Sequence, residues 1–161
     1  MNKMKNQPII RQLNEEKVGK LVLHVRFDET DRMGIVHNSK YLVYYDIARE
    51  SLLRKAKINF LKDVEQCGGQ IAIVEHNAKY LKPAKFGDTV TIYTALKTQT
   101  NVKSEFIYEL YVGEQLIHKG ETKIAWIDEN LKPINISKKL PEVYNKLKKY
   151  VITEEDINGV K

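Results

Sequence analysis

The feature that most constrains the fold is an alternation of apolar and polar residues that runs from Gly69 to Asp128. Four segments within it are rich in β-branched and aromatic residues, and they span residues 70–81, 87–99, 103–112 and 115–128. A period of two is typical of strands that bury one face. Gly113 and Glu114 leave room only for a tight hairpin between the last two segments, so these strands run antiparallel. The sequence therefore predicts four consecutive strands in an antiparallel sheet.

One strand and one long helix precede this region. Apolar residues occupy every second position from Leu21 to Phe27, within a segment 20–28 that we predict to be a half-buried strand. Residues 39–56 are predicted to form a helix whose first turns, residues 41–45, are apolar or amphipathic on every side. Because a surface helix keeps one polar face, this helix is expected to be enclosed by other elements. The predicted class is α+β, with a curled antiparallel sheet of five strands around one central helix.

The 161 residues are expected to form a single domain, 1–161, without repeats or linkers. Its core is predicted at about 20–130, with a mobile arm at 1–17, a C-terminal helix at about 141–150 and a frayed tail after Thr153. The net charge of +6 favours anionic partners, but the lysines are scattered, so we do not expect nucleic-acid binding. No segment approaches the roughly twenty apolar residues of a membrane span, and a cytoplasmic protein is expected.

A dense group of polar residues, DETDRMGIVHNSKY at 28–41, stands immediately before the predicted helix. Asn38 and Ser39 occupy positions where short polar side chains cap free backbone N–H groups, which is the simplest explanation for them. The same helix end carries the positive pole of the helix dipole and suits a developing negative charge. Gly34 places a turn inside the stretch. A structural cap and an anion-stabilising site are both compatible with this pattern.

Three carboxylates in the same stretch offer the other component of a hydrolytic site. Carboxylates are ionised at neutral pH, and they can attack a carbonyl directly or activate water. Together with an N–H donor at the helix start, such a group is suited to acyl transfer. Spacing alone does not decide among the three acids, which are Asp28, Glu29 and Asp31.

A longer segment, VRFDETDRMGIVHNSKYLVYYDIARESLLR at 25–54, resembles the signature of the 4-hydroxybenzoyl-CoA thioesterase family, and most of all its YbgC-type branch. A second segment, AKYLKPAKFGDTV at 78–90, resembles another recognisable part of that family. The resemblance covers about residues 20–130. It implies a hotdog fold, in which a curled antiparallel sheet wraps one central helix, and hydrolysis of acyl-CoA thioesters without a metal or redox cofactor.

The resemblance also implies roles for individual residues. The catalytic residues are Asp31, His37 and Asn38, and the substrate-binding residues are Gly34, Tyr41 and Lys103. By its place in the motif, Asp31 matches the catalytic carboxylate, as nucleophile or as general base, and the Asn38 N–H matches the group that polarises the thioester carbonyl. His37 and Tyr41 match residues that line the site, and Lys103 is the best candidate to meet CoA phosphates. Family members are dimers or tetramers with shared sites, and an acyl carrier protein is a further candidate partner.

One departure from the founding members of the family concerns the substrate. Those enzymes have a proline-alanine pair where this chain has Arg32 and Met33, and they lack a histidine at position 37. This difference favours aliphatic acyl groups over a hydroxybenzoyl group.

Two alternative functions remain open from the sequence. One is a non-catalytic module that binds acyl-CoA or acyl carrier protein, and the other is a hotdog dehydratase that acts on 3-hydroxyacyl chains through a histidine and a carboxylate. The surroundings of His24, His76 and His118 do not resemble the dehydratase motif. No local pair of these histidines has the spacing of metal ligands either, so no metal site is expected.

Overall fold

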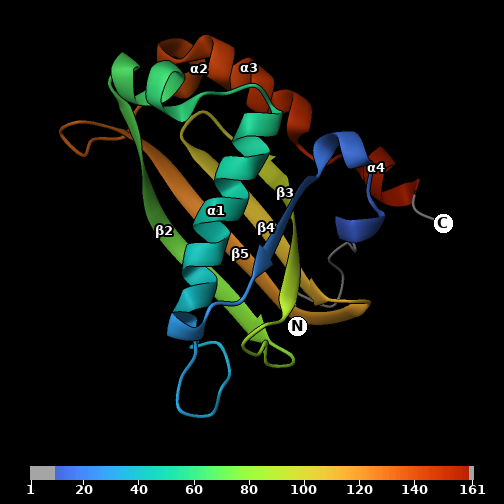
Figure 1. The fold of residues 1–161 in the computed structure, drawn as a ribbon. Coiled ribbons are helices and arrows are strands. Elements are labelled where there is room, and N and C mark those ends of the chain that lie inside the picture. The colour runs from blue at the N-terminus through green and yellow to red at the C-terminus, as the bar shows by residue number, and fades with distance from the viewer. Residues whose placement is uncertain (1–9, 160–161) are drawn as a thin grey trace.

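The structure is a computed structural model that describes residues 10–159. Its centre is a five-stranded antiparallel sheet with the strand order β1-β3-β4-β5-β2. The strands are β1 (Gly19–His24), β2 (Gly69–Tyr80), β3 (Thr89–Gln99), β4 (Lys103–Val112) and β5 (Gln115–Asp128). One long helix, α1 (Lys40–Lys55), lies across the concave face of the sheet (Figure 1). The predicted α+β class, with five strands curled around one helix, is confirmed.

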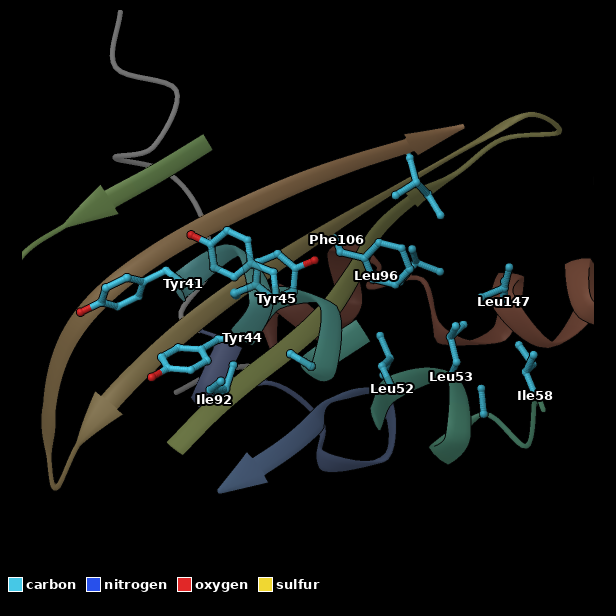
Figure 2. Close-up of a cluster of buried hydrophobic side chains, with 14 of the residues drawn as sticks. Tyr41, Tyr44, Tyr45, Leu52, Leu53, Ile58, Ile92, Leu96, Phe106 and Leu147 are labelled. Atoms are coloured by element: carbon cyan, nitrogen blue, oxygen red, sulfur yellow. The ribbon is translucent and has the colours of Figure 1, made fainter. Parts of the chain in front are cut away.

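The main core lies between α1 and the sheet. Tyr44, Tyr45 and Leu52 of α1 are almost completely buried. They belong to one cluster with Ile92 and with other side chains of β3 and β4, as Figure 2 shows. Removing each such side chain from water contributes on the order of 1.5–3 kcal/mol, so this layer fixes α1 on the sheet.

Helix α1 is less enclosed than its sequence suggests. Val43 and Ile47 remain 48% and 41% exposed, so residues 10–159 leave one apolar side of the helix partly open to solvent. The expectation of an enclosed helix is therefore wrong for a single chain. The tyrosines of the first turns face the sheet instead, where their large rings fill the space beneath the helix.

The first strand is shorter than predicted. It leaves the ladder after His24, because its partner β3 begins only at Thr89. Phe27 lies in a 3₁₀ turn (Phe27–Glu29) and is 77% exposed, so its predicted place on the buried face of a strand is wrong. The Glu29 carboxylate closes this turn by accepting the Arg26 N–H at 2.8 Å.

Part of the predicted mobile arm packs on the convex face of the sheet. Residues 1–9 of that arm lie outside the described residues, whereas Ile10–Gln12 and Glu15–Lys17 form 3₁₀ turns. Ile10 is buried in a second small cluster with Ala95 and Ile107. The outward apolar face of β3 and β4 is thereby covered, which explains why this part of the arm is structured.

The C-terminal segment covers the end of the sheet beside α1 (Figure 1). Helix α2 spans Ile136–Lys139, and α3 spans Pro141–Tyr150, as predicted. The tail expected to be frayed forms α4 (Glu154–Asn158), whose start is capped by mutual hydrogen bonds between Thr153 and Asp156. A π-helical turn, Phe60–Val64, follows α1. Among the described helices, none is long and apolar enough to cross a membrane.

Candidate active site

The predicted catalytic loop joins the 3₁₀ turn at 27–29 to the start of α1, and it projects beyond the helix N-terminus (Figure 1). The loop closes on itself because Asp31 N–H donates to the Ile35 carbonyl at 2.9 Å and Gly34 N–H donates to the Asp31 carbonyl at 3.0 Å. Gly34 has a φ of +76°, a left-handed conformation that favours glycine. A bridge from Ile35 to Lys85 ties the loop to the connection between β2 and β3.

The structure separates the three acids that spacing left equivalent. Glu29 is buried, and its carboxylate is occupied by the backbone turn at Arg26. Asp28 points into solvent, with a side chain 72% exposed. Asp31 lies inside the loop, where Oδ1 accepts the Met33 N–H at 2.8 Å, and no protein donor within residues 10–159 contacts Oδ2. Asp31 is thus the acid held in a fixed loop with a free carboxylate oxygen.

The start of α1 is capped differently from the expectation. The Ser39 side chain makes no capping hydrogen bond. Instead, His37 Nδ1 accepts the Ser39 N–H at 3.2 Å and lies 2.8 Å from Ser39 Oγ. An imidazole whose Nδ1 accepts a hydrogen bond carries its proton on Nε2 when neutral. The Asn38 N–H donates to no protein acceptor in the part of the chain that the structure describes, so it remains available to a ligand.

A cluster of aromatic rings lies next to this turn and contacts it through Tyr80. Tyr80, the last residue of β2, donates its hydroxyl to the Asn38 carbonyl at 3.0 Å. Its ring meets His118 edge-on at a centroid distance of 4.8 Å, and Tyr41 stacks on the same imidazole at 4.4 Å and also contacts Tyr80. Tyr41 is 2% exposed, so this predicted lining residue lies in the core of the single chain.

His118 is fully buried and is hydrogen-bonded through Nε2 to the hydroxyl of Tyr45. Burial lowers the pKa of His118 to about 4, so the imidazole is neutral at physiological pH. Its Nδ1 has no hydrogen-bond partner among the described residues. The neutral ring of His118 is therefore part of the buried aromatic cluster next to the turn at Asn38.

Two site features escaped the sequence reasoning, namely the support given by Tyr80 and the nearby His118. The sequence did contain a signal for Tyr80, because this residue lies in 78–90, the second segment that resembles the family. The pairing of Tyr80 with His118 across β2 and β5 depends on register, and the sequence does not fix that register.

Lys103 is not brought near the loop within one chain. It begins β4 and pairs with Ala125, which in turn pairs with Ala72 near the start of β2. Asn38 lies beside Tyr80 at the other end of that strand. The candidate phosphate-binding lysine and the candidate catalytic loop therefore occupy opposite ends of the sheet.

A groove of about 990 Å³ runs beside the C-terminal half of α1. Its lining includes Phe106, Ile124 and Trp126 from the sheet, together with charged side chains of the helix such as Arg49 and Glu50. The loop with Asp31 does not line it. Among the described residues, there is no group of three or more histidine, cysteine or acidic side chains arranged to hold a metal ion.

Several known proteins resemble this chain in sequence and in fold. The sequence model of the thioesterase-like superfamily matches residues 25–148. The chain is 33% identical over 138 residues to YneP of Bacillus subtilis, which is named as a candidate acyl-CoA thioesterase, and the match covers 82% of this chain and 99% of YneP. It is 25% identical over 129 residues to the acyl-CoA thioesterase YbgC of Haemophilus influenzae, with 78% and 93% of the two chains covered.

The solved structure of a DHNA-CoA thioesterase from Staphylococcus aureus superposes with a TM-score of 0.79 at 22% identity. The superposition covers 82% of this chain and 89% of that one, and it confirms the hotdog fold. The matched family segment contains the loop with Asp31, the whole of α1 and all strands after it. The chain belongs to the thioesterase-like superfamily.

Proposed function

We propose that this protein is a cytoplasmic acyl-CoA thioesterase that hydrolyses the thioester of an aliphatic acyl-CoA to the free acid and CoA. The observation that carries the proposal is that one short loop holds both a carboxylate oxygen and a backbone N–H that are free to meet a substrate. These are Oδ2 of Asp31 and the N–H of Asn38, which have no protein partner in the described residues. The likeness to YneP, which is named as a candidate acyl-CoA thioesterase, and to the acyl-CoA thioesterase YbgC supports the same activity.

In this reaction, the Asn38 N–H donates to the thioester carbonyl oxygen and stabilises the oxyanion as it forms. The N-terminal pole of α1 adds to that stabilisation, because charge develops where the helix dipole is positive. Asp31 either removes a proton from the attacking water or attacks the carbonyl carbon itself, giving an anhydride that water then hydrolyses. In both routes the C–S bond breaks, the CoA sulfur gains a proton, and the acyl group gains the hydroxyl of water.

His37 takes part at the same turn. Because Nδ1 is occupied by the Ser39 N–H, the neutral ring keeps Nε2–H for the substrate. We assign it the role of a donor beside the reacting carbonyl or the leaving sulfur. No metal or redox cofactor enters this scheme, because the carboxylate and the N–H groups supply the base and the oxyanion stabilisation.

We further propose that the active form is a homodimer, or a tetramer built from such dimers, joined through β2. This strand is an edge of the sheet, and its Ile73 and Val74 are 43% and 53% exposed. Antiparallel pairing of two β2 strands around a two-fold axis perpendicular to the sheet leaves both α1 helices on one face, running in opposite directions. The N-terminus of one α1 then lies beside the C-terminal half of the other.

This arrangement would complete the site. The loop with Asp31 from one copy would face the groove of the second copy, whose apolar floor includes Phe106 and Trp126 and suits an acyl chain. Lys103 of the second copy would lie at the same end as that loop, where it could meet the CoA phosphates. An acyl carrier protein presents the same phosphopantetheine thioester and is the alternative carrier.

The test is turnover of a panel of acyl-CoA and acyl carrier protein thioesters that varies chain length and includes hydroxybenzoyl-CoA. CoA release is followed with a thiol reagent, with a protein-only blank because Cys67 is exposed. The proposal expects hydrolysis with a preference for aliphatic chains. Saturable binding without turnover would instead indicate a binding module, and loss of water from a 3-hydroxyacyl thioester would indicate a dehydratase.

A further inference from the structure

The two peptide groups on either side of Asn38 are fixed by hydrogen bonds that an ordinary helix start does not have. In the first, the His37 carbonyl accepts the Lys40 N–H at 3.0 Å. In the second, the Asn38 carbonyl accepts the Tyr80 hydroxyl at 3.0 Å, and the Ser39 N–H donates to His37 Nδ1. The Asn38 N–H is therefore the one group of these two peptides without a protein partner among the described residues.

Tyr80 is well placed to hold this geometry. It ends β2, where it pairs with His118 of β5, so its backbone is fixed by the sheet. Its ring meets Tyr41 at 5.1 Å and an interplanar angle of 87°, and it meets His118 at 4.8 Å and 78°. Tyr41 and His118 are themselves buried. Two fixed rings thus restrain a side chain that is 50% exposed, and they leave its hydroxyl at the Asn38 carbonyl.

We propose that Tyr80 is a positioning residue for the reaction: its hydroxyl fixes the Asn38 carbonyl and thereby keeps the neighbouring Asn38 N–H aimed at the thioester oxygen. This inference rests on the proposed thioesterase function. Because each peptide group is planar, only φ and ψ of Asn38 join the two groups, and both flanking planes are pinned by hydrogen bonds. Without the Tyr80 bond, the second plane is held only by His37, and the turn gains freedom.

The expected fall in kcat is smaller than the fall caused by removing the oxyanion donor itself. Removing one oxyanion donor lowers kcat by about 10²–10³-fold in a well-studied protease. Loss of Tyr80's hydroxyl leaves the Asn38 N–H in place but less well oriented, so kcat should fall about 5–20-fold. KM should change by less than about twofold, since the substrate's main contacts are untouched.

The chain offers a matched control at the other end of the same helix. Tyr150 donates its hydroxyl to the Lys55 carbonyl at 3.1 Å, so Tyr150→Phe removes a hydrogen bond of the same type from the C-terminus of α1. Tyr80→Phe and Tyr150→Phe should lower the stability of the fold by similar, small amounts, because each variant loses one hydroxyl hydrogen bond to a backbone carbonyl. Only Tyr80→Phe should lower kcat, and only this variant should speed amide hydrogen exchange at Ser39 and Lys40, whose N–H groups are hydrogen-bonded within this turn.

The outcomes separate this inference from the proposed function. If the parent hydrolyses acyl-CoA but Tyr80→Phe retains the parent's kcat, the positioning role is overturned while the function stands. If both variants lose the same activity, the effect of Tyr80 is one of general stability, which also overturns it. Should the parent show no hydrolysis, hydrogen exchange still decides: unchanged exchange at Ser39 and Lys40 in Tyr80→Phe contradicts the inference.

Discussion

The hydroxyl of Tyr45 lies directly over Gly120, in the space that a side chain at position 120 would fill. A Cβ built on Gly120 would fall well inside 3.0 Å of both the oxygen and the ring of Tyr45. The tyrosine cannot move aside easily, because its ring stacks on Tyr108 at 4.3 Å and its hydroxyl is bonded to His118. Glycine at this point of β5 is thus what lets α1 approach the sheet.

The first prediction follows from that contact. Gly120→Ala should destabilise the fold by about 1–3 kcal/mol, because an extra methyl group overpacks a filled core. Chemical denaturation of the parent, Gly120→Ala, Tyr45→Leu and the double variant measures the coupling. The cost of the alanine should largely vanish in the Tyr45→Leu background. An equal cost in both backgrounds would show that Tyr45 is not the obstacle.

The buried His118 predicts a pH dependence of stability. Burial lowers its pKa to about 4, whereas a histidine in the unfolded chain titrates near 6.5. Below about pH 6.5 the unfolded chain therefore binds a proton that the folded chain excludes, so the free energy of unfolding falls as pH drops from 6.5 towards 4. The loss attributable to His118 is about 3 kcal/mol at pH 4 and absent above pH 7.

Unfolding free energies of the parent and of His118→Gln between pH 4 and pH 7.5 check this prediction. The carboxylates titrate in both proteins, so only the difference between the two profiles reports on His118. The parent should lose more stability than the variant as the solution becomes acidic. Parallel profiles across the whole range would contradict a buried neutral imidazole.

The proposed dimer predicts a contrast between the two edges of the sheet. Val74 on β2 and Val22 on β1 are 53% and 51% exposed, so a lysine at either position is equally tolerable in a single chain. Val74→Lys should give a monomer and lose most activity, because it places charge in the β2 contact. Val22→Lys should leave both the assembly and the activity unchanged. Sedimentation and turnover, measured on the same samples, check this contrast. A monomeric Val22→Lys together with an unchanged Val74→Lys would contradict pairing through β2.

Much of the fold could be predicted from the sequence because its strands bury one face each. The segments 103–112 and 115–128 alternate cleanly, and β4 and β5 have those same bounds. Phe27 was misplaced because the alternation continues beyond the point where a partner strand is present. Burial of Ile10 depends on an apolar patch of the convex face that is distant in sequence, which local pattern cannot reveal.

The candidate site was predictable only where local spacing decides its geometry. The loop and helix start that hold Asp31 and Asn38 are contiguous in the chain, so one motif places them together. Tyr80 reaches Asn38 across a separation of 42 residues, through a register of β2 that shifts between Ile73 and Glu75. A shift of this kind reverses which side chains face the helix, and it is set by packing rather than by the alternation itself.

In the proposed mechanism, Asp31 is the one of three neighbouring acids that drives hydrolysis of the thioester. The most direct measurement compares kcat/KM of the parent, Asp31→Asn and Asp28→Asn on the best substrate of the panel, with circular dichroism to verify folding. Asp28 is the matched control, since it is an aspartate of the same segment whose side chain is solvated. Asp31→Asn should lose about 10²–10⁴-fold in kcat/KM, and Asp28→Asn should keep near-parent activity. A folded Asp31→Asn variant with the parent's activity would contradict this role of Asp31.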